Sequence, residues 1–373
     1  MKTHPVFQAA TFWQRELANR TVVAPMSRVS ATSDGLATRE MNHYYTAFAR
    51  GGFSVIITEG IYTDTCSSKS YHHQPGLATV GQTESWEKVT RSVHQQPALI
   101  LAQLMHGGAL SQYLDVTLAP SAIQPVGNKM VAYGGEGAFR MPVAMSLEDI
   151  QTAKQGFINA AFNAYKAGFD GIEIHGANGY LLDQFLTPEL NSRQDQYGGD
   201  MPNRYRIIAE IIAGIRLVVP KRFIVGLRVS EGKVNDLGYR WAGGLHTAGE
   251  LAHVIKGSRP DFVHVAVQTG EWERDSFYAD GSSLASVIKE ITGIPVIANG
   301  GFHRLDKAAV ALTRQHADLL SIGKAALADP HWPAKTLNGA PLIPFHRDML
   351  WPEATISHTQ RIIDREQTIS HHL

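Results

Sequence analysis

Three residues in the middle of the chain, His175, Asn178 and Tyr180, have the types and spacing to act on a carbonyl group. The imidazole and the carboxamide both offer N–H donors, so together they could hold a carbonyl or anionic oxygen, as an oxyanion hole does. The Tyr180 hydroxyl can donate a proton. A single histidine is most often a hydrogen-bonded or surface residue. The His-x-x-Asn-x-Tyr pattern directly after an apolar run instead favours a role in binding and catalysis.

A second group of residues has the composition of a phosphate site. Gly300 and Gly301 follow one apolar run near the end of the chain, and Gly323 and Lys324 follow the next. Glycine lets a backbone approach a ligand closely, and the lysine would supply the countercharge. The pattern therefore predicts phosphate binding by backbone N–H groups and a helix start. The alternative is that Gly300 and Gly301 simply form a tight turn.

These residues follow short apolar runs that read as strands. The runs are rich in Val, Ile and Leu on both faces, which is typical of parallel strands covered by helices. We expect eight strands, at 21–26, 53–60, 98–106, 169–176, 222–230, 261–268, 294–301 and 317–324. Other polar residues that close these runs are Ser27, Glu59, Gln103, His106 and Arg228.

Amphipathic segments between the runs predict helices. The clearest lie at 38–51, 85–96, 146–168 and 202–219. Ser146 with Asp149, and Thr247 with Glu250, have the spacing of a capping box at a helix start. Gly168 lies where a helix would end.

Alternating strands and helices predict an α/β protein, a single (β/α)8 TIM barrel over residues 1–373. An open doubly wound sheet is disfavoured because the first strand–helix turn lacks GxGxxG. The Gly- and Pro-rich segment 107–145, between strand 3 and the next helix, is expected to form a cover or lid over the carboxyl ends of the strands. We expect the tail, 332–373, to pack over the barrel or a partner subunit, so a homodimer is one expected assembly.

Composition narrows the function classes. The chain has 373 residues, 34 basic and 34 acidic side chains, and no net charge, which argues against nucleic-acid binding. One cysteine, Cys66, is too few for an internal disulfide or a cysteine-bound iron–sulfur cluster. No metal site stands out. The sequence shows no signal peptide or membrane-spanning run, so we expect a cytoplasmic protein.

Six segments resemble the Old Yellow Enzyme family of FMN-dependent ene-reductases, within the NADH:flavin oxidoreductase/12-oxophytodienoate reductase group. The most specific is DGIEIHGANGYLLDQFLTPELNSRQDQYGGDMPNRYR at 170–206. The supporting segments are LANRTVVAPMSR (17–28), QLMHGG (103–108), VGLRVS (225–230), ANGGF (298–302) and SIGKAALADPHWP (321–333). The resemblance extends from about residue 17 to residue 333.

The resemblance implies tightly but non-covalently bound FMN, with NADH or NADPH as the electron donor. It implies roles for Ser27 near flavin O4 and N5, for Gln103 at O2 and N3, and for Arg228 beside N1 and O2. His175 and Asn178 match the pair that holds the substrate carbonyl oxygen, and Tyr180 matches the proton donor. The implied cofactor contacts are, in full, Ala24, Pro25, Met26, Ser27, Gly60, Gln103, Arg228, Gly300, Gly301, Gly323 and Lys324.

The sequence departs from the family pattern at several of these positions. Met105 stands where several relatives have a bulky aromatic residue, so the substrate pocket is expected to be roomier or differently shaped. Ser27 is smaller than the threonine of some relatives. Lys324 keeps the charge of the more usual arginine but not its two-pronged grip. Separately, Glu173 lies one layer below His175 on the same strand face. It should be a buried carboxylate that pairs with Arg228 or another basic group, or else faces a water-filled pocket.

The function expected from the resemblance is NAD(P)H-dependent reduction of activated alkenes, with small molecules as the partners. Hydride would go to the β-carbon of an α,β-unsaturated carbonyl compound or a nitroalkene, and Tyr180 would protonate the α-carbon. Two alternatives remain. One is a flavin oxidoreductase acting mainly on a quinone, a nitro compound or oxygen, and the other is a flavin-free barrel for a phosphate ligand.

Overall fold

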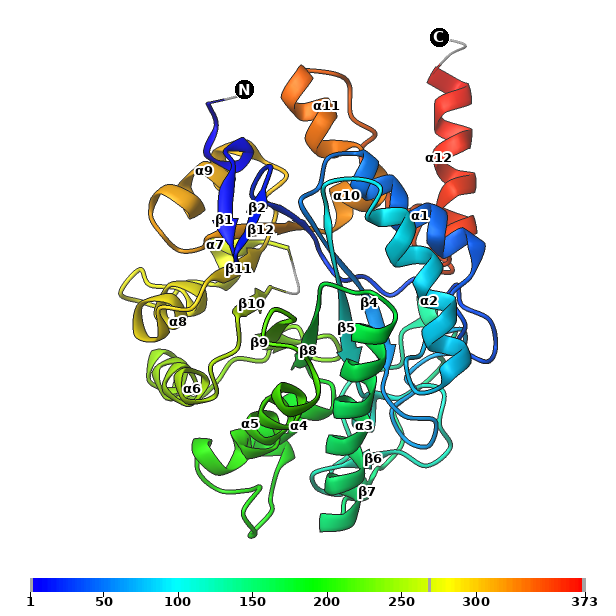
Figure 1. Cartoon of the computed structure of the whole chain (residues 1–373). Coiled ribbons are helices and arrows are strands. Elements are labelled where there is room, and N and C mark those ends of the chain that lie inside the picture. Colours follow the sequence, from blue (N-terminus) through cyan, green and yellow to red (C-terminus); the bar gives the residue numbers. More distant parts are fainter. Residues whose placement is uncertain (1–2, 268–269, 371–373) are drawn as a thin grey trace.

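Eight parallel strands close into a barrel in a computed structural model that describes residues 3–267 and 270–370. The predicted (β/α)8 barrel is therefore confirmed, and Figure 1 shows its helices arranged around the strands. Around the barrel the order is β10-β11-β12-β3-β4-β5-β8-β9, which places β8 opposite β12. The strands are β3 (Thr21–Val23), β4 (Val55–Tyr62), β5 (Leu99–Met105), β8 (Gly171–Asn178), β9 (Ile224–Lys233), β10 (Phe262–Ala266), β11 (Val296–Asn299) and β12 (Leu319–Ile322).

Helices follow the strands along the chain. They are α1 (Arg39–Arg50), α2 (Val80–Val93), α3 (Leu147–Lys166), α4 (Leu181–Leu186), α5 (Met201–Val218), α6 (Leu245–Ser258), α7 (Trp272–Asp275), α8 (Leu284–Thr292), α9 (Leu305–Thr313) and α10 (Lys324–Ala328). The capping box of Ser146 and Asp149 is present at the start of α3, and Gly168 follows that helix with a φ of 83°. The predicted box of Thr247 and Glu250 is wrong, because α6 begins three residues earlier, after Gly244.

The barrel interior is filled by apolar side chains near the amino ends of the strands. Phe262 fills the centre because Gly226, its partner on β9, has no side chain: a Cβ there would lie 2.0 Å from the Phe262 ring. Residues two positions further along the strands point the same way and form the floor of the site. This apolar layer consists of Leu17, Val22, Val55, Ile57, Leu101, Ile224, Phe262, Ile297 and Leu319.

A hairpin that the sequence did not reveal closes the amino end of the barrel. It consists of β1 (Ala10–Phe12) and β2 (Arg15–Leu17), which pair in antiparallel fashion. Trp13, at its turn, donates from Nε1 to the carbonyl of Asp261, and its ring lies 5.3 Å from the Phe262 ring. The hairpin turn has positive φ values at Trp13 (52°) and Gln14 (59°), positions where glycine or asparagine is the usual signal.

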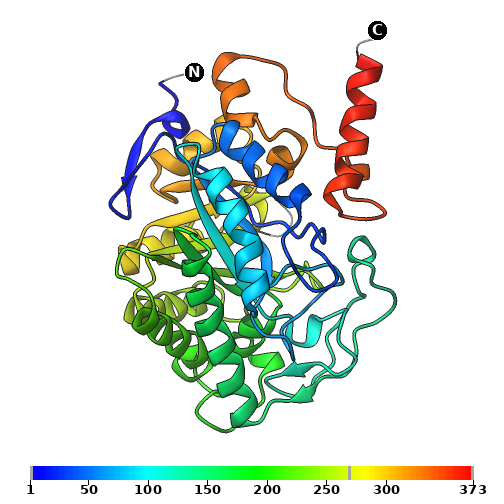
Figure 2. The ribbon, with the colours of Figure 1, turned by 45° about the vertical axis from the view of Figure 1, so that its right-hand side comes forward.

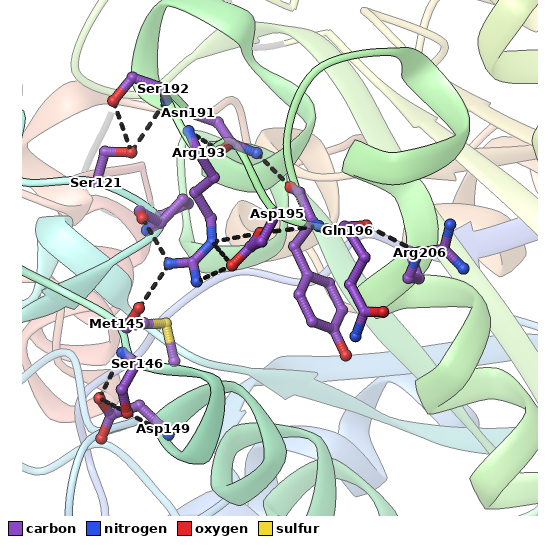
Figure 3. Close-up of polar contacts among 12 residues, drawn as sticks. Ser121, Met145, Ser146, Asp149, Asn191, Ser192, Arg193, Asp195, Gln196 and Arg206 are labelled. Carbon is purple, nitrogen blue, oxygen red and sulfur yellow. Dashed lines mark hydrogen bonds and ion pairs between the residues drawn. The ribbon is translucent and has the colours of Figure 1, made fainter.

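The cover segment, residues 107–145, forms loops, two short paired strands and the 3-10 helices η2 (Gly108–Leu110) and η3 (Val131–Tyr133). The short strands are β6 (Leu118–Ala119) and β7 (Val143–Ala144). Figure 2 shows the segment, in teal, as a layer of loops on one side of the barrel. Arg193 holds the segment to the region before α5: its Nη1 donates to the carbonyls of Pro120 (3.0 Å) and Met145 (2.5 Å), while Asp195 orients its guanidinium (Figure 3).

The tail after the barrel contains α11 (Trp332–Asn338) and α12 (Ile356–Ser370), which lies near α1 (Figures 1 and 2). Arg28, one residue after Ser27, donates from Nη2 to the carbonyl of Thr355 (2.8 Å) and to the Thr359 hydroxyl. Ala354 donates its N–H to Ala132 of the cover segment (2.9 Å). The tail thus contacts both the loop after β3 and the cover. In the described part of the chain, no helix combines the length and apolar character needed to span a membrane.

Candidate active site

A cavity of about 420 Å³ opens at the carboxyl ends of the barrel strands. Its size is within the range of ligand and cofactor sites. Fourteen of the fifteen predicted site residues line it: Ala24, Pro25, Met26, Ser27, Gln103, Met105, His175, Asn178, Tyr180, Arg228, Gly300, Gly301, Gly323 and Lys324.

Gly60 is the exception among the predicted site residues. It lies behind Met105, where a Cβ would be 2.3 Å from the Met105 sulfur and 3.4 Å from Oε1 of Gln103. Its carbonyl accepts a hydrogen bond from Gln74 (2.8 Å). Gly60 therefore makes room for two residues that face the cavity and does not itself line it. A direct contact of Gly60 with a cofactor stays a prediction.

A layer of polar side chains forms the floor of the cavity, and Glu173 is at its centre. Glu173 Oε1 accepts from Nε2 of Gln103 (2.8 Å), and Oε2 lies 2.8 Å from Nδ1 of His264. Arg228 Nη1 is 4.0 Å from Glu173 Oε1, and His264 Nε2 contacts the Ser321 hydroxyl at 2.8 Å. The prediction that Glu173 is buried beside basic groups, Arg228 among them, is confirmed.

The electrostatics of this layer keep one carboxylate and one guanidinium charged and the imidazole between them neutral. Burial and then the Arg228 guanidinium lower the pKa of His264, so the imidazole is neutral and donates from Nδ1 to the carboxylate. Burial by itself would raise the pKa of Glu173, but His264, Arg228 and Gln103 together lower it, so the carboxylate stays charged. Arg228 and Glu173 therefore balance each other within the floor.

The His175 imidazole is uncharged at neutral pH. It is buried, and burial together with the nearby Arg228 cation lowers its pKa well below the ordinary value. A neutral imidazole donates one hydrogen bond without bringing a full positive charge into the cavity. Asn178, three residues further along β8, also lines the cavity and has a left-handed backbone conformation, with a φ of 68°.

Tyr180 is the N-cap residue of α4 and lines the cavity beside His175, with the two ring centres 5.1 Å apart. Its hydroxyl lies 2.5 Å from the hydroxyl of Tyr71, a residue that the sequence did not single out. Burial raises the pKa of Tyr180 far above that of a free tyrosine, so the phenol keeps its proton. The Tyr71 ring in turn packs at 4.7 Å from Tyr133, which reaches the cavity from the cover segment.

The opposite end of the cavity is rich in glycine and basic groups. Gly300 and Gly301 have φ values of 136° and 85°, and a Cβ on Gly300 would lie 2.4 Å from Cβ of Trp272. Glycine is thus required at Gly300 by the turn and by Trp272 packing, as the tight-turn alternative expected. Lys324 begins α10 at the cavity wall. His303, which no sequence pattern marked, also lines this end, where partial burial and then the nearby Arg304 cation lower its pKa.

Two buried residues near the strand ends, His106 and Trp272, have structural contacts. His106 is buried, with Nε2 3.1 Å from the Ser67 hydroxyl and Nδ1 accepting from the Gly108 N–H. Trp272 is also buried, and its ring packs against Phe277 at 4.8 Å. Neither lines the cavity. Cys66 is an exposed free thiol.

Comparison with known proteins identifies the family. The model of the NADH:flavin oxidoreductase/NADH oxidase family matches residues 5–342. The chain belongs to this family. It is similar to solved structures of an Old Yellow Enzyme homologue from Zymomonas mobilis and of morphinone reductase in complex with tetrahydroNAD. The Zymomonas mobilis homologue has a TM-score of 0.82 and 27% identity, and the match covers 95% of this chain and 99% of that one. Morphinone reductase has a TM-score of 0.82 and 26% identity, and the match covers 95% of this chain and 96% of that one.

Curated relatives agree with this assignment to the Old Yellow Enzyme family. A probable flavin mononucleotide-dependent alkene reductase of Leishmania infantum is 30% identical over 88% of this chain and 89% of its own length. The 12-oxophytodienoate reductase 2 of Arabidopsis thaliana is 30% identical over 90% and 89%. An NADH oxidase of Thermoanaerobacter brockii is 30% identical over 87% of this chain, which spans only 49% of that longer protein. The chain is thus a flavin-dependent NAD(P)H oxidoreductase of the Old Yellow Enzyme family.

The residues at the cavity fit the flavin on which this family depends. Among the described side chains, Nε of Arg228 and Nδ1 of His175 are buried without a hydrogen-bond partner. Buried polar atoms of this kind normally bind a ligand or ordered water, and both residues line the cavity. A ring system that accepts hydrogen bonds could satisfy the Nε of Arg228. The glycine turns and Lys324 suit a phosphate on the far side.

Proposed function

We propose that this member of the family is an FMN-dependent ene-reductase, which uses NADH or NADPH to reduce the C=C bond of an α,β-unsaturated carbonyl compound or a nitroalkene. One observation carries the proposal. A neutral donor pair, His175 and Asn178, and a phenol that keeps its proton, Tyr180, line one cavity where β8 ends. Such a set holds an oxygen and delivers a proton, which are the two tasks that reduction of a conjugated alkene requires besides hydride transfer.

The chain would hold FMN across the mouth of the barrel. The backbone of Ala24, Pro25 and Met26 would lie along the flavin ring, with Gln103 and Arg228 at its pyrimidine edge. The phosphate would lie at the glycine turns after β11 and β12, beside Lys324, opposite β8. Bound FMN would supply hydride transfer between the nicotinamide and the alkene, and the fixed Arg228 cation would favour its reduced form.

His175 and Asn178 would bind the carbonyl or nitro oxygen of the alkene. Negative charge develops on this oxygen as hydride reaches the β-carbon, so hydrogen bonds to it are stronger in the transition state than in the ground state. Because burial keeps His175 neutral, the pair would not stabilise a charge before the reaction begins. The two donors would also orient the alkene and fix which carbon receives the hydride.

Tyr180 would then donate its proton to the α-carbon. Its raised pKa means that the proton is retained until a carbon with carbanion character accepts it. Tyr71 Oη, 2.5 Å away, is placed to stabilise the phenolate that remains. A small alkene is the expected substrate, and Met105 would contact it. The nicotinamide and the alkene would use the same cavity in turn.

The Tyr180→Phe variant tests the assignment, because it removes the proton donor and keeps the ring. Reoxidation of the reduced, FMN-loaded variant by 2-cyclohexenone should be slower than in the parent by about 10²–10⁴-fold. Reduction by NADPH or NADH should be largely intact. Stopped-flow absorbance under anaerobic conditions measures both steps separately. Tyr71→Phe is the matched control, since it removes a neighbouring hydroxyl and should have the smaller effect.

The same experiment also distinguishes the alkene from other acceptors of electrons from the reduced flavin. Reoxidation of Tyr180→Phe at the parental rate would contradict the role of Tyr180. If the reduced parent reacts with a quinone, a nitro compound or oxygen but with no activated alkene, the alternative oxidoreductase activity is correct. The flavin-free alternative is wrong, because the chain belongs to a family of flavin oxidoreductases.

A further inference from the structure

A buried ion pair lies outside the cavity, next to the residues that would bind the substrate oxygen. Lys233, the last residue of β9, has its Nζ 2.7 and 2.8 Å from the two carboxylate oxygens of Asp183 in α4. Asp183 is 0% exposed and Lys233 is 3% exposed. Neither lines the cavity. A buried ion pair contributes little or no net stability over apolar residues of the same size, so its presence points to a role beyond holding the fold.

The pair binds the peptide between Asn178 and Tyr180. The N–H of Gly179 donates to Oδ2 of Asp183 at 2.5 Å. Asn178 and Gly179 both have left-handed backbone conformations, with φ values of 68° and 88°. An asparagine in this conformation carries a strain of about 1 kcal/mol or more, which persists only where the surroundings hold it. The hydrogen bond to a charged carboxylate is of the strong kind that can hold such a turn.

The end of β9 also holds Asn178 itself. The Ser230 hydroxyl accepts from the Asn178 N–H (2.8 Å), and the Val234 N–H donates to the Asn178 carbonyl (3.0 Å). Asn178 is opposite Lys233 in the strand register, beyond an irregularity in the pairing of β8 with β9. The backbone of Asn178 is therefore fixed from β9, and Lys233 fixes the next peptide from the same strand through Asp183.

We propose that Asp183 and Lys233 are positioning residues, which aim the Asn178 carboxamide and the Tyr180 hydroxyl at the substrate oxygen and α-carbon. This inference rests on the proposed function, because it assigns the pair to the alkene half of the reaction. Without the pair, the Gly179 peptide loses its acceptor and the two side chains on either side of it can shift. A misplacement of about 1 Å can slow an enzyme by about 10²-fold.

The double variant Asp183→Leu/Lys233→Met tests the proposal, because it replaces the pair with apolar side chains of similar size. We expect FMN content to stay near that of the parent and the thermal unfolding midpoint to fall only modestly, because the apolar pair offsets the lost ion pair while the Gly179 N–H loses its acceptor. Anaerobic reoxidation by 2-cyclohexenone should show a saturating rate about 10–100-fold lower. Binding of phenol to the oxidised protein, followed in the visible spectrum, should weaken as well. A purely structural pair would alter stability but neither of these two measurements.

Two further variants sharpen the test. Asp183→Asn/Lys233→Met removes both charges and keeps an oxygen for the Gly179 N–H, so it should recover most of the lost rate. Lys289→Met/Asp318→Leu is the matched control: Lys289 Nζ is 2.7 Å from Asp318, which accepts the Val296 N–H, but this pair lies at the opposite end of the barrel. The control should reoxidise at the parental rate.

The outcomes separate this inference from the proposed function. If the parent is not reoxidised by the enone, the proposed function fails. If the parent reacts and Asp183→Leu/Lys233→Met reacts and binds phenol equally well, the positioning role alone is overturned. Should the apolar pair not fold, Lys233→Met alone decides, because a carboxyl group without its counter-ion binds the Gly179 N–H less strongly. Parental rate and phenol affinity in that variant would also overturn the proposal.

Discussion

Two layers inside the barrel contrast sharply although the same strands supply both. The lower layer, toward the amino ends, is apolar, and Leu101 of β5 and Leu319 of β12 belong to it. Two residues further along these strands, the upper layer has Gln103 and Ser321 in their place. Every second side chain of a strand points to the same face. The interior therefore changes from a packed apolar core to a layer of polar side chains within two residues along each strand.

The difference shows how the fold separates stability from function. Burial of apolar area in the lower layer contributes roughly 25 cal/mol per Å². The upper layer buries Glu173 and Arg228, which costs free energy unless each charge is paired and hydrogen-bonded. The lower layer can therefore be altered at a cost in stability alone, whereas the upper layer has to keep its charges matched.

Removing the charge of Glu173 should have the largest effect on folding. Glu173→Gln keeps the shape of the side chain but leaves the buried Arg228 cation unpaired, which costs about 3–5 kcal/mol of unfolding free energy. Urea denaturation of the flavin-free protein measures it. The control is Glu210→Gln, which removes a half-buried partner of Lys154 and should cost about 1 kcal/mol or less. Equal losses in the two variants would show that charge matching does not hold the upper layer.

A cavity in the lower layer should destabilise the barrel without disturbing the site. Leu101→Ala is expected to lower the unfolding free energy by about 2–5 kcal/mol, from lost apolar burial and the cavity left behind. The dissociation constant for FMN should stay within about 2-fold of the parent, because Leu101 lies below the floor. Fluorescence titration with FMN measures this constant.

Gln103→Leu is the matched change two residues further along β5. It removes the bond to Glu173 and the contact expected with FMN, so it should weaken FMN binding more than Leu101→Ala does. A Leu101→Ala protein that binds FMN as poorly as Gln103→Leu would mean that the two layers are not separate.

The smallest effect concerns Glu59, a third buried carboxyl group. Its side chain, on β4, accepts a hydrogen bond from the Tyr45 hydroxyl of α1 at 3.2 Å. Burial raises the pKa of Glu59 to about 7, against hydrogen bonds from the Arg28 and Val29 N–H groups that lower it. The native protein therefore binds this proton more tightly than the unfolded chain does. Its stability should fall as the pH rises from about 4.5 through 7.

Glu59→Gln, which resembles the protonated acid, should lose this part of the pH dependence. Above pH 7 it should be more stable than the parent by up to about 3 kcal/mol, since the pKa rises from 4.5 to about 7 and one pKa unit corresponds to about 1.4 kcal/mol. Urea denaturation at several pH values gives the difference. If the difference in unfolding free energy between Glu59→Gln and the parent does not grow between pH 4.5 and 7, Glu59 is already charged at low pH.

The strands and most of the site could be predicted because both depend on local pattern. Apolar runs marked all eight strands, and residues at their carboxyl ends meet wherever such a barrel closes. His264 was missed although its period-two spacing from Phe262 places it on the inward face, a signal that was available. Tyr71 could not be found this way, because it contacts Tyr180 from 109 residues away along the chain.

Boundaries that depend on single backbone conformations were less predictable. The hairpin over the amino end turns at Trp13 and Gln14, which carry no turn signal, and it is held by packing on Phe262. The start of α6 depends on a turn at Gly244, so the helix begins before Thr247, the residue expected to cap it. In both cases the structure is decided by a backbone conformation or a long-range contact that the local sequence does not mark.

The most direct test of the central claim is one anaerobic spectral cycle of the purified protein. The proposed function predicts visible absorbance of oxidised FMN, loss of that absorbance when NADPH or NADH is added, and its return on addition of about one equivalent of 2-cyclohexenone, with cyclohexanone as the product. A colourless protein that takes up no FMN, or a reduced flavin that no activated alkene reoxidises, would contradict it.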